Sequence, residues 1–262
     1  MKLNVDGCEV FATTGGTGFD PAKPTVVFLH GAGFDRTAWR LQTRWFAHHG
    51  RSVLALDFPA HGWSEGPVLA SVPAMADWTA KVIAAVGLKS AALVGHSMGA
   101  LVALDCAARH ADKVRALALC GVAVDMPVHP EMLESAKANT LKVQELMTFW
   151  GLGNALHKGG MVSPGLWLRR ESLAVLQGND PGVIHADLAA CNAYKDAPAR
   201  AAEVRCPTVL ILADGDLMTP TSKAKPLAAA IAGSKTVIIP NCGHSMMVER
   251  PDETLAALQA NV

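Results

Sequence analysis

The chain has 262 residues, 50% of them hydrophobic, with 23 basic and 23 acidic side chains and a formal net charge of +0. This hydrophobic fraction excludes an intrinsically disordered chain, and the length allows one large domain with a substantial core. Because no basic stripe accompanies the balanced charge, we expect no nucleic acid partner.

The first residues, MKLNVDGCEVFATTGG, lack the apolar run of a secretory signal. The most apolar long window, residues 91–108, contains His96, Asp105 and two glycines, so it does not predict a membrane span. Six scattered cysteines without a CxxC pair suit free thiols in a reducing cytosol, and no histidine spacing typical of a metal site is present. We expect a cytoplasmic monomer or homodimer that uses no metal or cofactor and binds no membrane.

Short apolar runs alternate with helix-like stretches along most of the chain. After a start that favours one or two antiparallel edge strands, the apolar runs cover residues 25–30, 52–58, 91–95, 114–121, 208–214 and 236–240. The helix-like stretches cover residues 36–49, 73–87, 99–110, 221–232 and 251–261. The runs are continuous rather than alternating, which is typical of strands covered on both faces. The pattern predicts an α/β fold: a mostly parallel open sheet with helices on both faces.

The alternation stops between about Val124 and Val204. Residues 129–151 predict one helix that ends at Gly151, and residues 164–178 and 180–194 predict shorter helices opened by Pro and Gly. We therefore expect a helical cap at 124–204, inserted into a core formed by 1–123 and 205–262. Met147, Trp150 and Trp167 are candidates for an apolar substrate-binding wall, although residues at such helical spacing usually pack in the core.

The chemistry centres on Gly95-His96-Ser97-Met98-Gly99, which lies between a predicted strand and a predicted helix. A serine in the pattern G-x-S-x-G at such a turn presents its hydroxyl beyond the sheet, while the flanking glycines let strand and helix approach. A serine hydroxyl is a weak nucleophile, so it needs a histidine base and a carboxylate that orients the histidine. His96 itself is expected to pack beneath the turn and is a weaker candidate for a proton carrier.

Suitable partners follow two later predicted strands, in the order acid and then histidine. DGDLMTP contains Asp216, with Asp214 as a competing carboxylate, and NCGHSMM contains His244. Carboxyl ends of parallel strands meet at one edge of the sheet, where ligands bind. FLHGAG places small residues after the first parallel strand, and the amides of Ala32 and Met98 are candidates for an oxyanion hole. Their neighbours Gly31 and Gly33 are expected to contact the substrate.

From VVFLHGAG to CGHSMMVERPDE, the chain resembles the α/β-hydrolase family, in its branch with a serine nucleophile. The resemblance implies Asp216 rather than Asp214 as the acid, because the family acid stands four residues before a proline, here Pro220. It also implies His244 as the base and Ala32 as one oxyanion donor. One departure is Ala60, which stands in DFPAHGWS where the family usually has glycine.

The expected activity is hydrolysis of a small or medium apolar ester through an acyl-enzyme, as in a carboxylesterase. Relatives with the same three residues include carbon–carbon bond hydrolases, enol-lactonases, thioesterases and cofactor-free perhydrolases, and fold alone does not separate them. A ligand-binding protein without activity, or a lyase using His244 as base, is a further alternative.

Overall fold

The structure, a computed structural model, describes residues 1–158 and 167–262. One sheet of eight strands has the order β1-β2-β4-β3-β5-β6-β7-β8. β1 and β2 form an antiparallel hairpin, β2 pairs antiparallel with β4, and all other neighbours are parallel. The strands are β1 (Lys2–Val5), β2 (Cys8–Thr13), β3 (Thr25–Leu29), β4 (Ser52–Leu56), β5 (Ala91–His96), β6 (Val114–Cys120), β7 (Thr208–Ala213) and β8 (Lys235–Ile239). The predicted α/β architecture, including the antiparallel edge, is confirmed.

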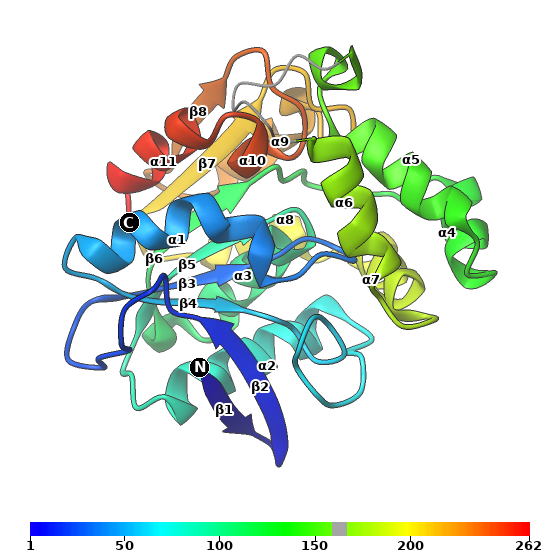
Figure 1. Cartoon of the computed structure of the whole chain (residues 1–262). Coiled ribbons are helices and arrows are strands. Elements are labelled where there is room, and N and C mark those ends of the chain that lie inside the picture. The colour runs from blue at the N-terminus through cyan, green and yellow to red at the C-terminus, as the bar shows by residue number, and fades with distance from the viewer. Residues whose placement is uncertain (159–166) are drawn as a thin grey trace.

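Helices cover both faces of the sheet (Figure 1). α1 (Arg40–His48), preceded by the 3-10 turn η1 (Arg36–Trp39), packs with α10 (Met246–Glu249) and α11 (Pro251–Gln259) on one face. On the other face, α2 (Val72–Ala85), α3 (Met98–Arg109), α8 (Ala197–Glu203) and α9 (Thr221–Ala230) pack in sequence, and the short turn η2 (Ala111–Lys113) follows α3. Every residue of β3, β4, β5 and β7 is buried, which explains the continuous apolar runs.

Alternate strand residues enter two separate cores. Val27 and Leu93 pack with α2 and α3 side chains, whereas their neighbours Phe28 and Val94 pack with Trp39 and the other helical layer. This is the period-two alternation of a strand that is covered twice. None of the helices in the described ranges is both long and apolar enough to cross a bilayer.

Between β6 and α8 the chain forms α4 (Pro130–Lys137), α5 (Leu141–Gly151), the turn η3 (Asn154–Lys158), α6 (Leu168–Gln177) and α7 (Val183–Ala193). We call α4, α5, α6 and α7 the inserted helices, and Figure 1 shows them together beyond one end of the sheet. The single helix expected over 129–151 is wrong, because α4 and α5 are separate. The chain turns at Asn139, whose φ of 51° is left-handed and incompatible with continuing a helix.

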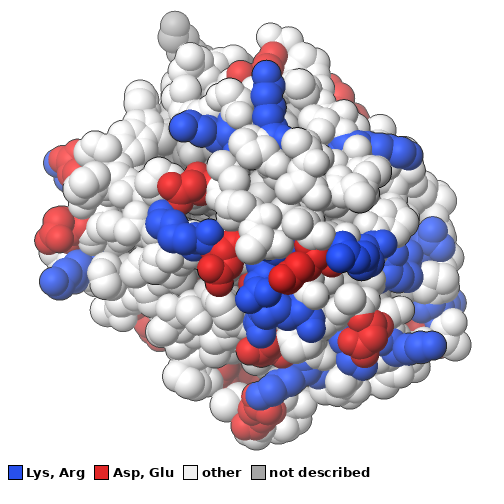
Figure 2. All heavy atoms as spheres, turned by 180° about the vertical axis from the view of Figure 1, so that it is seen from behind, with Lys and Arg blue, Asp and Glu red and all other residues white. Residues whose placement is uncertain are grey.

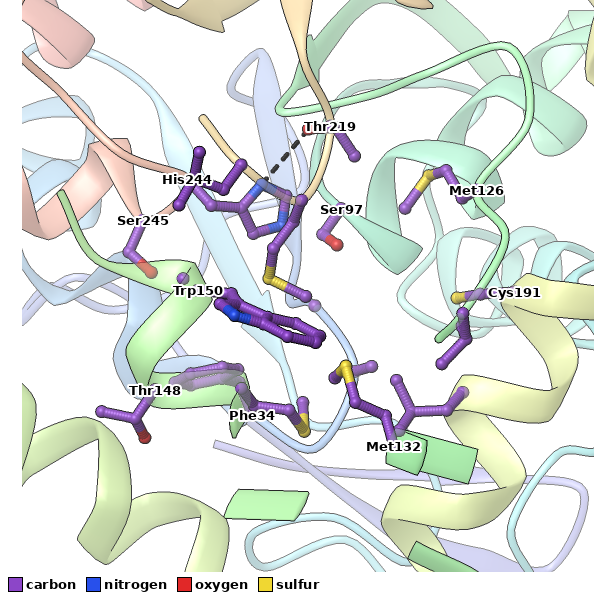
Figure 3. Close-up of a pocket in the computed structure, with 18 of the residues that line it drawn as sticks. Phe34, Ser97, Met126, Met132, Thr148, Trp150, Cys191, Thr219, His244 and Ser245 are labelled. Carbon is purple, nitrogen blue, oxygen red and sulfur yellow. Dashed lines mark hydrogen bonds between the residues drawn. The ribbon is translucent and has the colours of Figure 1, made fainter. Parts of the chain in front are cut away.

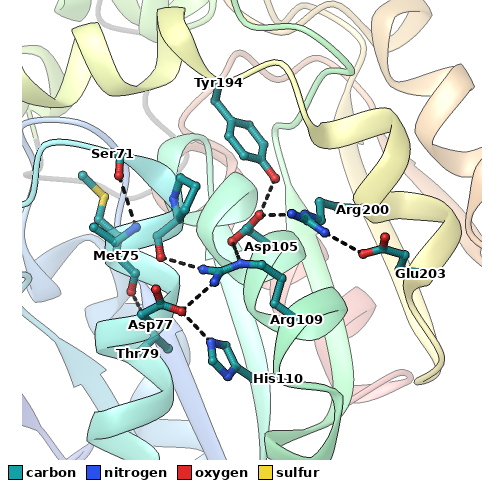
Figure 4. A network of polar contacts seen from close by, with 12 residues as sticks. Ser71, Met75, Asp77, Thr79, Asp105, Arg109, His110, Tyr194, Arg200 and Glu203 are labelled. Atoms are coloured by element: carbon teal, nitrogen blue, oxygen red, sulfur yellow. Dashed lines mark hydrogen bonds and ion pairs between the residues drawn. The ribbon is translucent and has the colours of Figure 1, made fainter.

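A buried carboxylate ties the end of α7 to α3 (Figure 4). Asp105 on α3 accepts hydrogen bonds from the Tyr194 hydroxyl at 2.8 Å and from Arg109 Nε at 2.6 Å. Arg200 on α8 lies 3.3 Å from the same carboxylate. α3 is the helix that follows Ser97, so this network fixes the inserted segment to the element that carries the candidate nucleophile.

Candidate active site

Ser97 occupies a sharp turn between β5 and α3. Its φ of 53° and ψ of −117° lie outside the regions that a side chain normally allows. A Cβ on Gly95 would lie 2.1 Å from the Gly99 oxygen, and a Cβ on Gly99 would lie 2.5 Å from the Leu29 oxygen. Both flanking positions therefore require glycine, because strand and helix backbones touch there. The turn is strained where a nucleophile would be presented.

His244 and Asp216 form a buried pair after β8 and β7. His244 Nδ1 donates to Asp216 Oδ2 at 2.7 Å. The same carboxylate accepts hydrogen bonds from the amides of Met218 and Thr219 and from the Thr219 hydroxyl. Burial alone would raise the pKa of Asp216, but His244 and these donors outweigh it and hold the pKa well below its usual range. The carboxylate is thus ionised and fixed in orientation.

The competing carboxylate lies elsewhere. Asp214 is exposed and accepts a hydrogen bond from the Cys242 amide at 3.3 Å. Asp216 contacts the His244 imidazole directly, whereas Asp214 contacts the backbone at Cys242, two residues before His244. The geometry therefore favours Asp216 over Asp214 for orienting the histidine.

The second nitrogen of the His244 ring is free to act. Nε2 is buried and has no hydrogen-bond partner within the described part of the chain. Ser97 and His244 line the same cavity, and Figure 3 shows the Ser97 side chain next to the imidazole. With Nδ1 committed to Asp216 as a donor, Nε2 of the neutral ring carries the lone pair that a base requires.

His96 is fully buried and structural in its contacts. Its Nε2 donates to the His244 carbonyl oxygen at 2.9 Å. Burial, aided by the nearby His244 ring, lowers the pKa of His96 to about 3, so the ring is neutral. Its hydrogen bond supports the backbone of His244, which argues against His96 as a proton carrier.

The turn from Gly31 to Phe34 lies against the serine. A Cβ on Gly31 would lie 2.9 Å from His96 Nδ1 and 3.3 Å from the Ser97 Cβ. The Gly31 oxygen accepts from His30 Nδ1 at 2.9 Å and from the Phe34 amide at 3.1 Å. Both hydrogen bonds fix the peptide group that joins residues 31 and 32, whose N–H points the opposite way in a trans peptide.

The two predicted oxyanion donors are unengaged. Ala32 follows directly in that turn, and Met98 is the first residue of α3, where an amide has no acceptor within the helix. Within the ranges that the structure describes, neither amide donates a hydrogen bond. Two such amides beside a serine are suited to stabilising an oxyanion.

The cavity in front of Ser97 has a volume of about 220 Å³. Figure 3 shows Trp150, Met132 and Met126 around it. Among the predicted substrate-binding residues, Gly31, Met147 and Trp150 line the cavity. Gly33 and Trp167 are not among its lining residues, and Trp167 is 61% exposed at the start of α6.

No charged lysine, arginine, aspartate or glutamate lines the cavity in the described parts of the chain. The eight residues at 159–166, GGMVSPGL, contain no charged residue in their sequence either. Residues 1–158 and 167–262 also hold no group of three or more His, Cys, Asp or Glu side chains placed to bind a metal ion. The described lining does contain histidines, namely His96, His129 and His244.

Sequence reasoning missed two residues that support His244. Thr219 donates to Asp216 Oδ2 at 2.7 Å and lies 3.2 Å from His244 Nδ1. A Cβ on Gly121 would lie 3.1 Å from the imidazole, so this glycine gives the ring its space. An available signal for Thr219 was its position three residues after Asp216, a spacing typical of local side chain to backbone turns. No local signal distinguishes Gly121.

Known proteins resemble most of the chain. A pimeloyl-[acyl-carrier protein] methyl ester esterase from Chromobacterium violaceum is 30% identical over 249 residues, which cover 90% of this chain and 92% of that protein. An (E)-2-((N-methylformamido)methylene)succinate hydrolase from Acinetobacter baylyi is 24% identical, with 90% and 89% covered. The crystal structure of an enol-lactonase from Burkholderia xenovorans has a TM-score of 0.88 at 21% identity, with 99% and 98% covered.

The family assignment extends over most of the sequence. The Alpha/beta hydrolase family matches residues 26–258, from the second residue of β3 to the next-to-last residue of α11. The match includes the turn at Ser97 and the loops that carry Asp216 and His244. The chain belongs to the alpha/beta hydrolase family.

Proposed function

We propose that this protein is a serine hydrolase that cleaves small or medium, uncharged, apolar esters through an acyl-enzyme on Ser97. The observation that carries the proposal is the hydrogen-bonded pair of His244 and Asp216, with the free Nε2 of His244 in the cavity that Ser97 lines. The similarity to the methyl ester esterase from Chromobacterium violaceum supports an ester as the substrate.

The reaction begins when Ser97 Oγ attacks the ester carbonyl carbon and His244 Nε2 takes its proton. Asp216 stabilises the imidazolium and holds the ring, while the amides of Ala32 and Met98 stabilise the negative oxygen. The carbon–oxygen bond to the alcohol then breaks, and His244 returns the proton to the departing oxygen. A water molecule, deprotonated by His244, then attacks the acyl carbon, the bond to Ser97 Oγ breaks, and His244 returns the proton to Ser97 as the carboxylic acid leaves.

The lining of the cavity supports an uncharged acyl group. A carboxylate bound there would leave water with no lysine or arginine beside it among the described residues, a cost of several kcal/mol. The Acinetobacter baylyi relative is named for a substituted succinate, which carries carboxylates. The methionines and Trp150 of this cavity instead provide flexible, apolar contact surface.

We further propose that the inserted helices act as a cap over the site, within an insertion at 124–204, and that the protein works in the cytoplasm on a small molecule. Figure 2 shows that, on one face of the molecule, lysines and arginines are interspersed with acidic residues. Mixed charge of this kind gives little attraction for nucleic acid or for an anionic membrane.

Ser97→Ala provides the test, measured with p-nitrophenyl butyrate against the wild type and against Ser234→Ala, a serine remote from the cavity. We expect the loss of turnover at Ser97 to be about 10³-fold or more, and none at Ser234. A fluorophosphonate should add once to the wild type, at Ser97. Equal turnover by wild type and Ser97→Ala would reject the serine mechanism.

Methyl hexanoate and monomethyl adipate test the substrate class, since they differ only in a terminal methyl or carboxylate group. We expect kcat/KM to be about 100-fold higher for methyl hexanoate. Thioester, enol-lactone and vinylogous diketone substrates with comparable apolar groups then separate esterase activity from the related activities. A preference for the adipate would contradict an uncharged substrate.

A further inference from the structure

The inserted helices hold one residue of the turn beside Ser97 by both of its backbone groups. The Gly33 amide donates to Asp187 Oδ2 on α7 at 2.8 Å, across 154 positions of sequence. The Gly33 oxygen accepts from Asn179 Nδ2, between α6 and α7, at 2.7 Å and across 146 positions. A core residue is thus oriented by side chains of a distant segment.

Packing at Gly33 is equally close. Its φ of 68° is left-handed, and a Cβ there would lie 2.9 Å from Leu176 Cδ2 and 3.1 Å from Ile184 Cγ1. These side chains belong to α6 and α7. The turn and the inserted helices therefore fit against each other with no space for a side chain, so a shift of either one displaces the other.

Asp187 is itself held in place by a residue of the core, His61. Its Oδ2 accepts from His61 Nε2 at 2.9 Å, and His61 Nδ1 faces the Pro59 oxygen at 3.0 Å. Both ring nitrogens face acceptors, so both carry protons and the pair is ionic. Burial would lower the pKa of His61, but Asp187 outweighs it and the pKa is raised. His30, 5.0 Å away between ring centres, and Asp57 are the other titratable neighbours of His61.

The hold on Gly33 reaches the amide of Ala32 through consecutive peptide groups. The Gly33 carbonyl that Asn179 binds shares a peptide group with the Phe34 amide. The Phe34 amide donates to the Gly31 oxygen at 3.1 Å, and the Gly31 carbonyl belongs to the same peptide group as the Ala32 amide. Because each peptide group is planar, fixing one of its ends fixes the direction of the other.

We propose that Asp187 and Asn179 are positioning residues, through which docking of the inserted helices sets the direction of the Ala32 amide in the oxyanion hole. The inference rests on the proposed serine mechanism. On this proposal, the inserted helices contribute to transition-state stabilisation and also form a wall of the cavity. If these helices no longer dock against Gly33, turnover falls even for substrates that bind normally.

Asn179→Leu and Asp187→Ala test the proposal, with Glu171→Gln as the matched control. Glu171 on α6 forms a different contact with the core, an ion pair with Arg40 on α1 at 2.7 Å, and does not touch Gly33. We expect kcat for p-nitrophenyl butyrate to fall about 10- to 100-fold in the two test variants, part of the loss known for removal of an oxyanion donor. KM should stay within about three-fold, and binding of a boronic acid that forms a tetrahedral adduct should weaken in parallel with kcat.

A merely structural role would lower the melting temperature without this separation of kcat from KM. Asp187→Asn, which keeps an acceptor oxygen, should restore part of kcat. Asn179 is half-buried, so Asn179→Leu still provides the test if Asp187→Ala does not fold.

Amide hydrogen exchange at residues 31–34 supplies a readout that does not depend on turnover. We expect faster exchange there in Asn179→Leu and Asp187→Ala than in the wild type or Glu171→Gln. Unchanged exchange, or wild-type kcat in both folded variants, overturns the inference. Turnover that survives Ser97→Ala would instead reject the proposed function, whatever the exchange shows.

Discussion

Gly121, the residue after β6, leaves the space that the His244 imidazole occupies. A Cβ on Gly121 would lie 3.1 Å from both Cε1 and Nδ1 of the ring, and its φ of 58° is left-handed. The end of one strand thus determines how closely a side chain from a distant loop approaches the sheet edge. The imidazole of His244 can lie this close to the strand end only because Gly121 has no side chain.

Gly121→Ala should lower both stability and turnover. The left-handed conformation costs a side chain roughly 1–2 kcal/mol, and the added methyl group pushes the imidazole away from Asp216 and Ser97. We expect kcat to fall about 10-fold, since small displacements of catalytic groups have large effects on rate. Gly233→Ala is the control, because Gly233 has a φ of 70° and open space around it. It should lose similar stability at unchanged kcat, and a similar loss of kcat there would contradict the steric explanation.

Asp216→Asn should reduce kcat by about 10³- to 10⁴-fold with little change in KM, as expected when the histidine loses its orienting carboxylate. The amide group of asparagine cannot accept all the hydrogen bonds that His244 and Thr219 donate to Asp216. Asp214→Asn keeps an acceptor for the Cys242 amide and should retain kcat within about two-fold. The reverse order of effects would assign the acid to Asp214.

Asp105→Ala should destabilise the fold by about 3 kcal/mol, because Tyr194 and Arg109 lose a buried charged partner. Tyr194→Phe removes one hydrogen bond and should cost about 1 kcal/mol. Urea unfolding measures both. Asp125→Ala breaks the exposed ion pair with Lys195 and should change the unfolding free energy by less than about 0.5 kcal/mol. Equal changes in unfolding free energy at Asp105 and Asp125 would show that the buried network stabilises the fold no more than an exposed ion pair does.

Stability should fall as the solution is acidified below about pH 6.5, the ordinary pKa of histidine. Burial lowers the pKa of His30 to about 4 and that of His96 to about 3. Between these values and pH 6.5, the unfolded chain binds protons that the folded chain does not, so the unfolding free energy decreases with falling pH. Each histidine contributes a slope of up to about 1.4 kcal/mol per pH unit.

Urea unfolding from pH 7 to pH 4.5 measures that slope. His30→Gln removes one of the two groups and retains a donor and an acceptor, so its slope should be smaller than that of the wild type. His49→Gln changes an exposed histidine and serves as the control. An unchanged slope in His30→Gln would show that His30 does not remain neutral in the folded protein.

Ala60→Gly should increase stability by up to about 1 kcal/mol, because the φ of Ala60 is 66° and a left-handed residue without Cβ is not strained. Greater freedom of glycine in the unfolded chain offsets part of the gain, by about 0.4–1 kcal/mol. Ala84→Gly, at an exposed position of α2, should instead destabilise the protein. If Ala60→Gly lost as much stability as Ala84→Gly, the backbone at Ala60 would not be strained.

Several features followed from the sequence because their causes are local. Continuous apolar runs determined the strands, since residues covered on both faces are apolar at every position. The glycines around Ser97 indicated a tight turn, because backbone contacts there exclude any side chain. The placement of Ser97, Asp216 and His244 at one edge of the sheet also followed. Each residue closely follows a parallel strand, and the carboxyl ends of such strands meet at one edge.

Other features came only from tertiary structure. The expected helix over 129–151 divides at Asn139, and Trp167 is exposed rather than part of the cavity. The contacts of Asp187 with His61 and Gly33 span 126 and 154 positions, and nothing in the local sequence specifies them. Periodicity reports which face of an element is apolar, but not which distant element covers it. A buried ion pair between distant segments is decided by how those segments pack, and so is the space beside a glycine.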